Sequence, residues 1–500
     1  MQKSYAGLAC NDTYFFEAEQ QFESLIEQVS NQSALKQELG AIENLLQSEG
    51  MELLRCLLQG HSDLRAAQEK VTEAVDGQDG KRRTHKRWGV NRTIETLFGS
   101  IEQRRIGYSG ANANVIYPMD MLLNLGPSKY SDGLCRRIAE EASKNSFDEC
   151  VKSLSTTTGG WVPKRQCEAI VAQVAQDFDD YYDSTAIDES RHENLLVLTT
   201  DSKGIVMRTE DLREATKKAA QAAPKNRVRL SPGEKKNRKR MATTAAVYSV
   251  DPNIKTPEQV LDRSLAKPKR PEIENKRVWA SVERGQKSVI TEAVTEAISR
   301  DEANQRDWVF VVDGEISQLR YIHQLLEESE REATIVLDFI HVLEYLWKAA
   351  YCFHKAGSDE AGAWVQTKAL NVLRGKASTV AAAMRRSATN QKLSKGKRTA
   401  VDKCANYLLS NKAYLKYDEY LRLGYPIASG VIEGACRHLI NDRLGITGAR
   451  WGLKTAEAVL KIRSIRSSGD FDEYWKFHKA QEKQRNHCSK YLHPEDILVA

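Results

Sequence analysis

The stretch that most constrains the fold is 308–315, WVFVVDGE. Its apolar residues form a continuous run, which is typical of a buried strand of the parallel type. The run ends on Asp313, and Gly314 follows at once. An acidic side chain at the C-terminal end of such a strand lies at the mouth of an open α/β sheet, where ligands and metal ions bind. Alternatively, Asp313 only caps a turn or the next helix, because Asp-Gly is a turn signal.

Length and composition indicate a soluble protein of several domains. At about 150 residues per domain, 500 residues predict two to four units. The apolar share of 41% and the charged share of 28% are ordinary for globular proteins. The nine cysteines show no C-x-x-C spacing, and their odd number argues against a disulfide framework. Without a signal segment or a long apolar run, we expect a cytoplasmic protein with no membrane partner.

The first part of the chain predicts a helical segment over 1–80, from apolar residues at helical spacing. The basic stretch 81–89, KRRTHKRWG, is either a phosphate-tracking segment or a solvated loop. Residues 92–108 alternate apolar and polar around Gly99 and predict a β-hairpin, with 109–125 as a loop.

Residues 130–182 predict three short helices. Ser146 begins one of them, and Pro163 stands at the start of the next, after a Gly159-Gly160 turn. This pattern fits a helix-turn-helix whose recognition helix begins near Lys164 and Arg165. An ordinary helical bundle fits it equally well. We therefore assign 81–185 to a β-hairpin and helix-turn-helix-like DNA-binding region within a mainly α N-terminal part.

Further strands are predicted at 195–200, 205–207, 241–252, 277–283 and 334–338. Asp201 ends the first of them, with a turn at 202–204. Together with 308–312 and the helices between them, they roughly trace the order β-β-β-α-β-α-β-α, with 195–200 and 205–207 as two arms of one hairpin and basic insertions at 211–240 and 252–277. This order predicts an α/β fold with a mixed sheet flanked by helices. A third acid, Glu433, falls in the first turn of a helix after Ser429-Gly430, where capping alone would also favour it.

Three carboxylates in one cleft repel each other and stay ionised together only around divalent cations. Two Mg²⁺ ions about 3.5–4 Å apart would activate a nucleophile and stabilise the leaving oxygen of a phosphodiester. The basic segment 224–240 is a plausible electrostatic footprint for nucleic acid. Its candidate DNA contacts are Lys235, Lys236, Arg238, Lys239 and Arg240.

The chain resembles a DDE transposase of a bacterial insertion sequence. The resemblance is to the ISKra-type group, which is related to ISL-type and Mutator-like transposases. The resemblance runs from about residue 90 to 476. The segments that carry it are RTIETLFGSIEQRRIGY, VVDGE, LDFIHVLEYLW, SGVIEGACRHL with RLGITGARW, and EAVLKIRSIRSSGDFDEYW. In the fourth of these, Arg437, Arg443 and Arg450 are further candidate DNA contacts.

The resemblance implies an RNase H-like catalytic core. Its first part would span 190–345, a helical insertion 346–423 and the closing helices 424–480, followed by a tail at 481–500. Asp201, Asp313 and Glu433 match the catalytic, metal-binding triad. Asp338 and His341 match a D/C-x-x-H motif that relatives carry after the second acid. His341 is either an assistant of the site or a hydrogen-bonded structural residue. Asp188 competes with Asp201 for the first position, and Asp338 with Asp313 for the second.

The implied activity is DNA transposition. The protein would bind the terminal inverted repeats of its insertion sequence and catalyse strand cleavage and strand transfer with Mg²⁺ or Mn²⁺. Its partner would be double-stranded DNA, at the bacterial nucleoid, with at least a homodimer on two DNA ends. Relatives often carry a small zinc-binding module after the hairpin. Residues 106–118 contain no cysteine, so we expect no structural zinc there. The alternatives are a catalytically inactive or domesticated DNA-binding protein and a stand-alone nuclease of RNase H-like fold.

Overall fold

The computed structural model describes residues 12–185, 194–222, 238–262, 264–266, 268–446 and 448–498. The chain divides into two compact units, one of Met1–Ser184 with Phe471–Ala500 and one of Thr185–Asp470. We call them the terminal unit and the central unit. The break after Asp470 falls inside 424–480, which the sequence assigned as a whole to the closing helices of the core.

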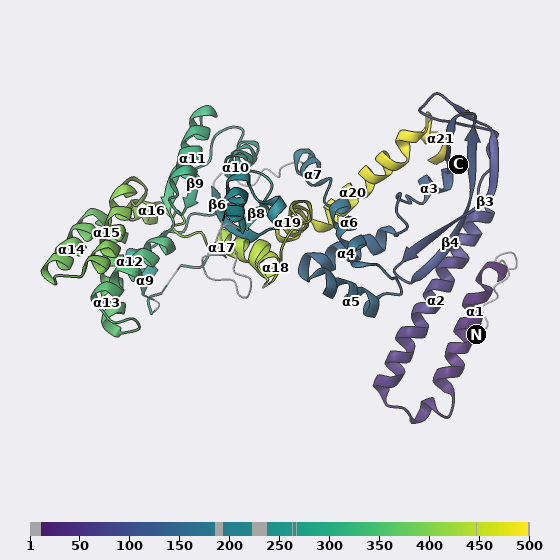
Figure 1. Ribbon diagram of the computed structural model, residues 1–500, viewed down its shortest axis with the longest axis horizontal. Coiled ribbons are helices and arrows are strands. Elements are labelled where there is room, and N and C mark those ends of the chain that lie inside the picture. Colours follow the sequence, from purple (N-terminus) through teal and green to yellow (C-terminus); the bar gives the residue numbers. More distant parts are fainter. Residues whose placement is uncertain are drawn as a thin grey trace. The chain divides into compact units, whose positions relative to one another are not determined.

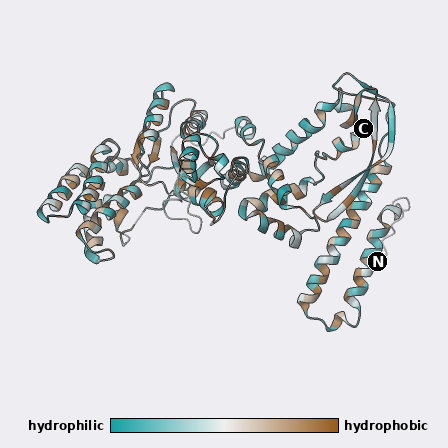
Figure 2. Cartoon of the chain, viewed as in Figure 1, coloured by the Kyte–Doolittle hydropathy of each residue, from teal (hydrophilic) through white to brown (hydrophobic). Residues whose placement is uncertain are grey.

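The terminal unit begins with two long helices, as predicted for the first part of the chain. They are α1 (Asp12–Ser30) and α2 (Leu39–Ala67), joined by the short η1 (Ala34–Lys36), and they lie side by side in Figure 1. Figure 2 shows polar and apolar patches alternating along both helices. This pattern is expected of amphipathic helices that bury one face.

The predicted hairpin is confirmed and is part of a three-stranded antiparallel sheet. Strands β3 (His85–Thr96) and β4 (Gly99–Gly110) turn just before Gly99, and β5 (Ala113–Ile116) adds to β4. The basic stretch 81–89 is not a loop. It holds β2 (Arg82–Arg83), which pairs with β1 (Val75–Asp76), and the start of β3. The loop expected at 109–125 likewise contains β5 and α3 (Pro118–Leu122).

The helical part of the terminal unit comprises α4 (Asp132–Lys144), α5 (Phe147–Thr157), α6 (Lys164–Val174) and α7 (Phe178–Ser184), where three helices were predicted. Both predicted starts are confirmed, since Ser146 caps α5 by accepting from the Glu149 amide at 3.1 Å and α6 begins after Pro163.

The connection from α5 to α6 is longer than the turn of about three to four residues in a helix-turn-helix. It packs on the hairpin instead. The Gly159 amide donates to Leu97 O at 2.8 Å, and a Cβ at Gly159 would collide with the Phe98 backbone. The double glycine therefore allows the close approach of two backbones.

The segment 481–500, expected as a tail, is part of the fold of the terminal unit. Helix α20 (Phe471–Asn486), η5 (Cys488–Lys490) and α21 (Pro494–Leu498) close this unit. The Tyr491 side chain is 3% exposed, and the Leu492 amide donates to Asp76 O at 3.0 Å.

The central unit is built on a five-stranded mixed sheet of β6 (Leu195–Val206), β7 (Lys239–Val250), β8 (Ile273–Ser281), β9 (Trp308–Val312) and β10 (Thr334–Leu337). In the order β10-β9-β6-β7-β8, the β6–β7 and β7–β8 pairs are antiparallel, while β9 is parallel to β6 and β10. Helices α10 (Gln286–Arg300), α11 (Ile316–Glu328) and α12 (Phe339–Phe353) follow β8, β9 and β10. The predicted α/β class and element order are thus confirmed. The described parts of the insertions carry η2 (Thr209–Asp211), α8 (Glu214–Ala222) and α9 (Pro257–Leu261). The expected ranges 211–240 and 252–277 reach too far, because β7 already begins at Lys239 and β8 at Ile273.

One strand prediction was wrong. No turn interrupts 202–204, because β6 pairs with β7 in continuous register from Leu195 with Val250 to Val206 with Lys239. Asp201 therefore lies inside a strand and not at its end. The parallel partner β9 pairs with β6 only as far as Thr199, opposite Val311. Asp201 is consequently the second residue beyond the point where the parallel pairing stops.

Helices cover both edges of the sheet. On the β8 side, α19 (Leu453–Ser468) places Ser468 Oγ 3.0 Å from the Val278 amide, and the buried Glu457 carboxylate accepts from Ser281 Oγ at 2.7 Å and from the Val282 amide at 2.8 Å. On the β10 side, the Tyr417 hydroxyl of α16 (Tyr417–Leu423) donates to Leu337 O at 2.7 Å. These side chains satisfy backbone groups that an open edge would expose.

The segment 346–423 is helical, as predicted. It contains α13 (Asp359–Leu373), α14 (Ala377–Asn390), α15 (Lys395–Ser410), η3 (Lys412–Tyr414) and α16, which gather into one cluster in Figure 1. Across the described ranges, no helix has the length and apolar character needed to cross a bilayer. Cysteines within those ranges are free thiols.

We predict that Glu457→Ala lowers the free energy of unfolding of the central unit by about 3 kcal/mol. The substitution leaves buried donors of the β8 edge without their charged acceptor. Calorimetry of the full chain measures the effect, with Glu332→Ala at an exposed loop position as the control. Equal melting temperatures for the two variants would show that Glu457 does not secure this edge.

Candidate functional site

Asp313 stands directly after the fully buried β9, in a tight turn. Its Oδ1 accepts from the Glu315 amide at 3.1 Å, and Tyr407 of α15 donates its hydroxyl to the Asp313 carbonyl at 3.0 Å. Gly314 has φ +84°, and a Cβ there would collide with Leu337. Asp313 thus makes the turn contact expected of a residue that only caps a turn. It does not cap the next helix, because Glu315 is the capping residue there.

The surroundings of the Asp313 carboxyl disfavour its charged form. Burial raises its pKa above the ordinary range, and the nearby carboxylate of Asp201 raises it further. The amide of Glu315 and the imidazole of His341 act in the opposite direction. The strand register agrees with this effect of Asp201, because Asp201 and Asp313 each lie two residues beyond the last β6–β9 pair, Thr199 with Val311. His341, in the first turn of α12, favours the charged form of Asp313.

Asp201 is held by three donors. Lys203 places Nζ 2.9 Å from Oδ2, the Ser202 amide donates to Oδ1 at 2.6 Å, and Cys436 Sγ lies 3.4 Å from Oδ2. Burial tends to lower the pKa of Lys203, but the hydrogen bond and charge of Asp201 raise it overall, with Glu433 adding to the rise. The Lys203 ammonium thus forms an ion pair with Asp201, and the negative charge of Glu433 also favours its charged form.

Glu433 lies in the first turn of α17 (Gly430–Ala435), as predicted. A π-helical turn, Cys436–Asn441, follows and leads into α18 (Asp442–Leu444). Such turns often mark functional sites. Both α17 and the π turn pack against β6. Burial raises the pKa of the Cys436 thiol to about 12, so it remains a thiol that can donate to Asp201.

Asp338 has a positioning role in the fold. It is 4% exposed. Its Oδ1 accepts from the Ile340 amide at 2.7 Å, which caps α12, and its Oδ2 accepts from the amide of Ser429 at 3.1 Å and from the Ser429 hydroxyl. Ser429 directly precedes α17. Asp338 therefore ties the start of the Glu433 helix to the end of β10.

Two of the predicted DNA contacts serve the fold instead. Arg443 is 3% exposed, and its guanidinium lies 4.8 Å from the centre of the Trp451 ring. Burial lowers the pKa of Arg240, whose guanidinium donates to the carbonyls of Val282, Asp211 and Glu283 at 2.7, 3.1 and 3.0 Å. Neither was distinguishable from a surface arginine in the sequence.

The other predicted contacts lie elsewhere. Lys164 pairs with Asp148 at 2.6 Å at the start of α6, where Arg165 is exposed. In the central unit Lys239 and Arg450 are exposed, the Arg437 side chain is 74% exposed, and Arg238 is half-buried. Lys235, Lys236 and the competing Asp188 lie outside the described residues.

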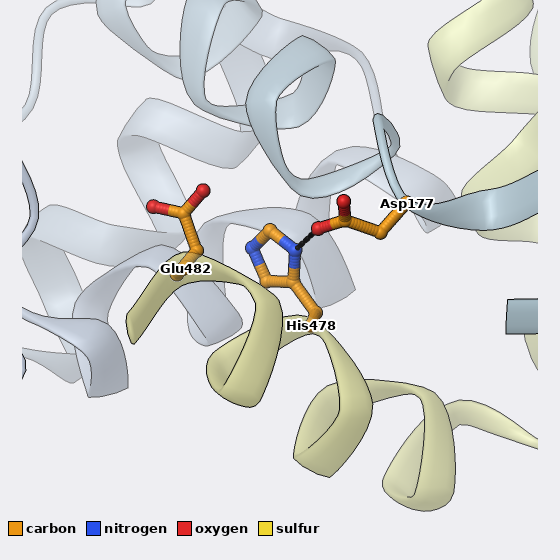
Figure 3. A group of neighbouring side chains, drawn as sticks. All are labelled: Asp177, His478 and Glu482. Carbon is orange, nitrogen blue, oxygen red and sulfur yellow. Dashed lines mark hydrogen bonds and ion pairs between the residues drawn. The ribbon is translucent and has the colours of Figure 1, made fainter. Parts of the chain in front are cut away.

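A second cluster of metal-ligating side chains was not predicted. Asp177, His478 and Glu482 of the terminal unit offer ligand atoms within 4.8 Å of one another. Figure 3 shows the imidazole between the two carboxylates, with His478 Nδ1 2.6 Å from Asp177 Oδ2. The three residue types fit a metal site in composition.

Existing contacts give this second cluster a structural explanation. Glu482 accepts from Gln173 at 2.9 Å, Gln176 at 2.7 Å and Asn486 at 2.8 Å, and Arg485 bridges it to Asp177. A guanidinium between two carboxylates supplies the positive charge that a metal would otherwise bring. The network ties α20 to α6 and α7.

Comparison with known proteins identifies no relative. A scan against models of known protein families gave no match, and a search of curated proteins gave none either. What the site can do therefore follows from its own residues. The Lys203 ammonium pairs with Asp201 of β6, and the charge of Glu433 from α17 also raises its pKa. Asp313 follows β9, the parallel neighbour of β6. Carboxylate oxygens of this kind are hard donors that suit divalent cations.

We predict that Asp313→Asn stabilises the chain at neutral pH in the absence of divalent cations. The raised pKa means that the folded state binds the Asp313 proton more tightly than the unfolded chain does. This carboxyl therefore costs stability as the pH rises above 3.8, and the cost is complete above its folded pKa. Melting temperatures from pH 4 to 8 with a chelator test this, with the exposed Asp251→Asn as control. A variant that melts below the parent at pH 7 would contradict it.

Proposed function

We propose that this chain is a DDE-type transposase of the ISKra-type group, with Asp201, Asp313 and Glu433 as its metal-binding acids. The observation that carries the proposal is the place where the pairing of β6 with β9 ends. Asp201 and Asp313 each lie two residues beyond the last pair, Thr199 with Val311. Cys436, which directly follows the helix that carries Glu433, places Sγ 3.4 Å from Asp201 Oδ2.

The sheet supports an RNase H-like core. The antiparallel strands β6, β7 and β8 come first, and β9 and β10 then add in parallel on the other side of β6, each after a helix. This is the β-β-β-α-β-α-β-α order expected for such a core. The helical segment between β10 and α17 corresponds to the expected insertion.

The three carboxylates supply oxygen donors that fit Mg²⁺ or Mn²⁺. In the structure, the Lys203 ammonium supplies positive charge at Asp201, as a metal cation would. When bound, a pair of such ions activates the attacking oxygen and stabilises the leaving oxygen of a phosphodiester. The chain's own residues orient the acids. The turn at Gly314 fixes Asp313, Cys436 holds the Glu433 helix against Asp201, and Asp338 holds the start of that helix through Ser429.

The partner in this proposal is double-stranded DNA, bound by a homodimer or larger assembly. The basic stretch 81–89, which holds β2 and the start of β3, carries the exposed Arg82 and Arg87. Strands in antiparallel pairs, as these are, can enter DNA grooves. The start of α6, with Lys164 and Arg165, is a second candidate contact for the transposon ends.

One observation favours the alternative of a DNA-binding protein without catalysis. The Asp201 carboxylate already forms an ion pair with the Lys203 ammonium at 2.9 Å. Asp201 must give up that ion pair in order to bind a metal cation. Metal binding separates the two proposals, because only the transposase requires it.

We predict that Mn²⁺ raises the melting temperature of the parent but not that of Asp313→Asn. At ten times its dissociation constant a bound metal adds about 1.4 kcal/mol. Lys203→Met should bind Mn²⁺ several-fold more tightly, since it removes a competing cation. If neither Mn²⁺ nor Mg²⁺ changes the melting temperature of the parent, the result would favour the non-catalytic alternative.

We further predict that the protein nicks DNA carrying the ends of its own element when Mg²⁺ is present. Asp313→Asn, Asp201→Asn and Glu433→Gln should each abolish nicking while DNA binding persists. Gel analysis of end-labelled duplexes measures cleavage, with Asp251→Asn as a matched control. Cleavage by Asp313→Asn at the parental rate would remove Asp313 from the proposed triad.

A further inference from the structure

Beyond the acids, β6 continues to a hollow of about 520 Å³ in the central unit. The side chains around it come from the end of β6, from η2 and α8, from the start of β7 and from the loop before α19. Three of the described side chains around it are arginines, Arg208, Arg238 and Arg450, and Glu210 is the only acid among these described side chains. Such a lining attracts an anion.

The backbone beneath the hollow is a hydrogen-bonded ladder. The Trp451 amide donates to Val206 O at 3.0 Å and the Arg208 amide to Trp451 O at 2.8 Å. On the other side, the Met207 amide donates to Arg238 O at 3.0 Å. The segments that carry the arginines are therefore held side by side, at the spacing of neighbouring strands.

The alternation of side chains then places two guanidiniums on one face. Met207 and Trp451 form a parallel bridge, and both are buried, 3% and 6% exposed. Arg208 and Arg450 are the neighbours of these two residues, so they project to the opposite face. Both are exposed, and within the described ranges neither has an ion-pair partner. Their charge is available to a ligand.

We propose that this hollow, the Arg208–Arg450 pocket, binds a backbone phosphate of the DNA that flanks the cleavage site. The proposal rests on the proposed function and adds a subsite to it. Arginine suits this ligand because its planar fork matches phosphate oxygens. Along an extended strand, Arg208 lies roughly 20 Å from Asp201. At 3.4 Å per base pair, this distance places the bound phosphate about six base pairs or fewer from the cut.

Salt dependence of DNA binding provides the first test. For the element-end duplex, the slope of log affinity against log salt should fall by about one for Arg208→Ala or Arg450→Ala and by about two for the double variant. Arg422→Ala, an exposed arginine of α16, should leave the slope unchanged. A double variant with the parental slope would overturn the proposal.

Single methylphosphonate linkages, which remove one phosphate charge each, locate the contact. In the parent, one linkage or two adjacent ones within about six base pairs of the cut should weaken binding. In the double variant the same linkages should not weaken DNA binding further, because the contact between the pocket and the phosphate is already lost. Equal losses in parent and variant at every linkage would overturn the pocket.

Inorganic pyrophosphate separates this inference from the proposed function. It should raise the melting temperature of the parent and not of the double variant, and Asp313→Asn should respond like the parent. If pyrophosphate binds in this way but the parent binds no DNA, the proposed function and the DNA subsite both fail, and only an anion pocket remains. If the parent binds and cuts DNA while pyrophosphate and the linkages do not distinguish the variants, the pocket alone fails.

Discussion

The central unit depends on a mismatch in length between two paired strands. β6 pairs with antiparallel β7 over its whole length, whereas parallel β9 leaves it after Thr199. Among the described residues, this edge of β6 therefore has no strand partner from Thr200 until Trp451 bridges Met207. Gln318 of α11 takes the Thr200 carbonyl at 2.9 Å, and α17 with its π turn packs along the following residues. Because Asp201 and Lys203 lie on this open part of the strand, the place where pairing ends is also the place where charged groups can meet.

The residues around the acids divide into those that face the cluster and those that hold it. The Asp338 carboxylate accepts three hydrogen bonds and links the end of β10 to α12 and to the start of α17. The Tyr407 hydroxyl ties the helical insertion to the backbone of Asp313. The insertion thus closes one edge of the sheet and steadies the turn after β9. Removing charge from Asp313 and removing a support such as Asp338 act on stability in opposite directions, because one relieves repulsion and the other breaks a buried network.

Cationic side chains in this chain perform two distinct tasks that composition does not separate. Arg240 donates to backbone carbonyls, and Arg443 packs against an aromatic ring. Arg485 joins two carboxylates in the terminal unit. Arg208 and Arg450 lie on an exposed face beside a hollow. The distinction arises from strand alternation and from which partners the fold brings near. A basic stretch in the sequence therefore predicts positive charge but not its availability to DNA.

Local pattern determined much of this protein. The apolar run ending at Asp313, the alternation of the β3–β4 hairpin, the start of α5 at Ser146 and the helix that carries Glu433 all follow from hydrophobic period and capping chemistry, which act over a few residues. Tertiary structure alone decided the rest. Ser202-Lys203-Gly204 has turn composition, but pairing with β7 keeps it extended and places Lys203 beside Asp201. The thiol of Cys436, the Asp338–Ser429 link and the Arg208–Arg450 pocket join segments that are distant in sequence, and only the packed sheet brings them together.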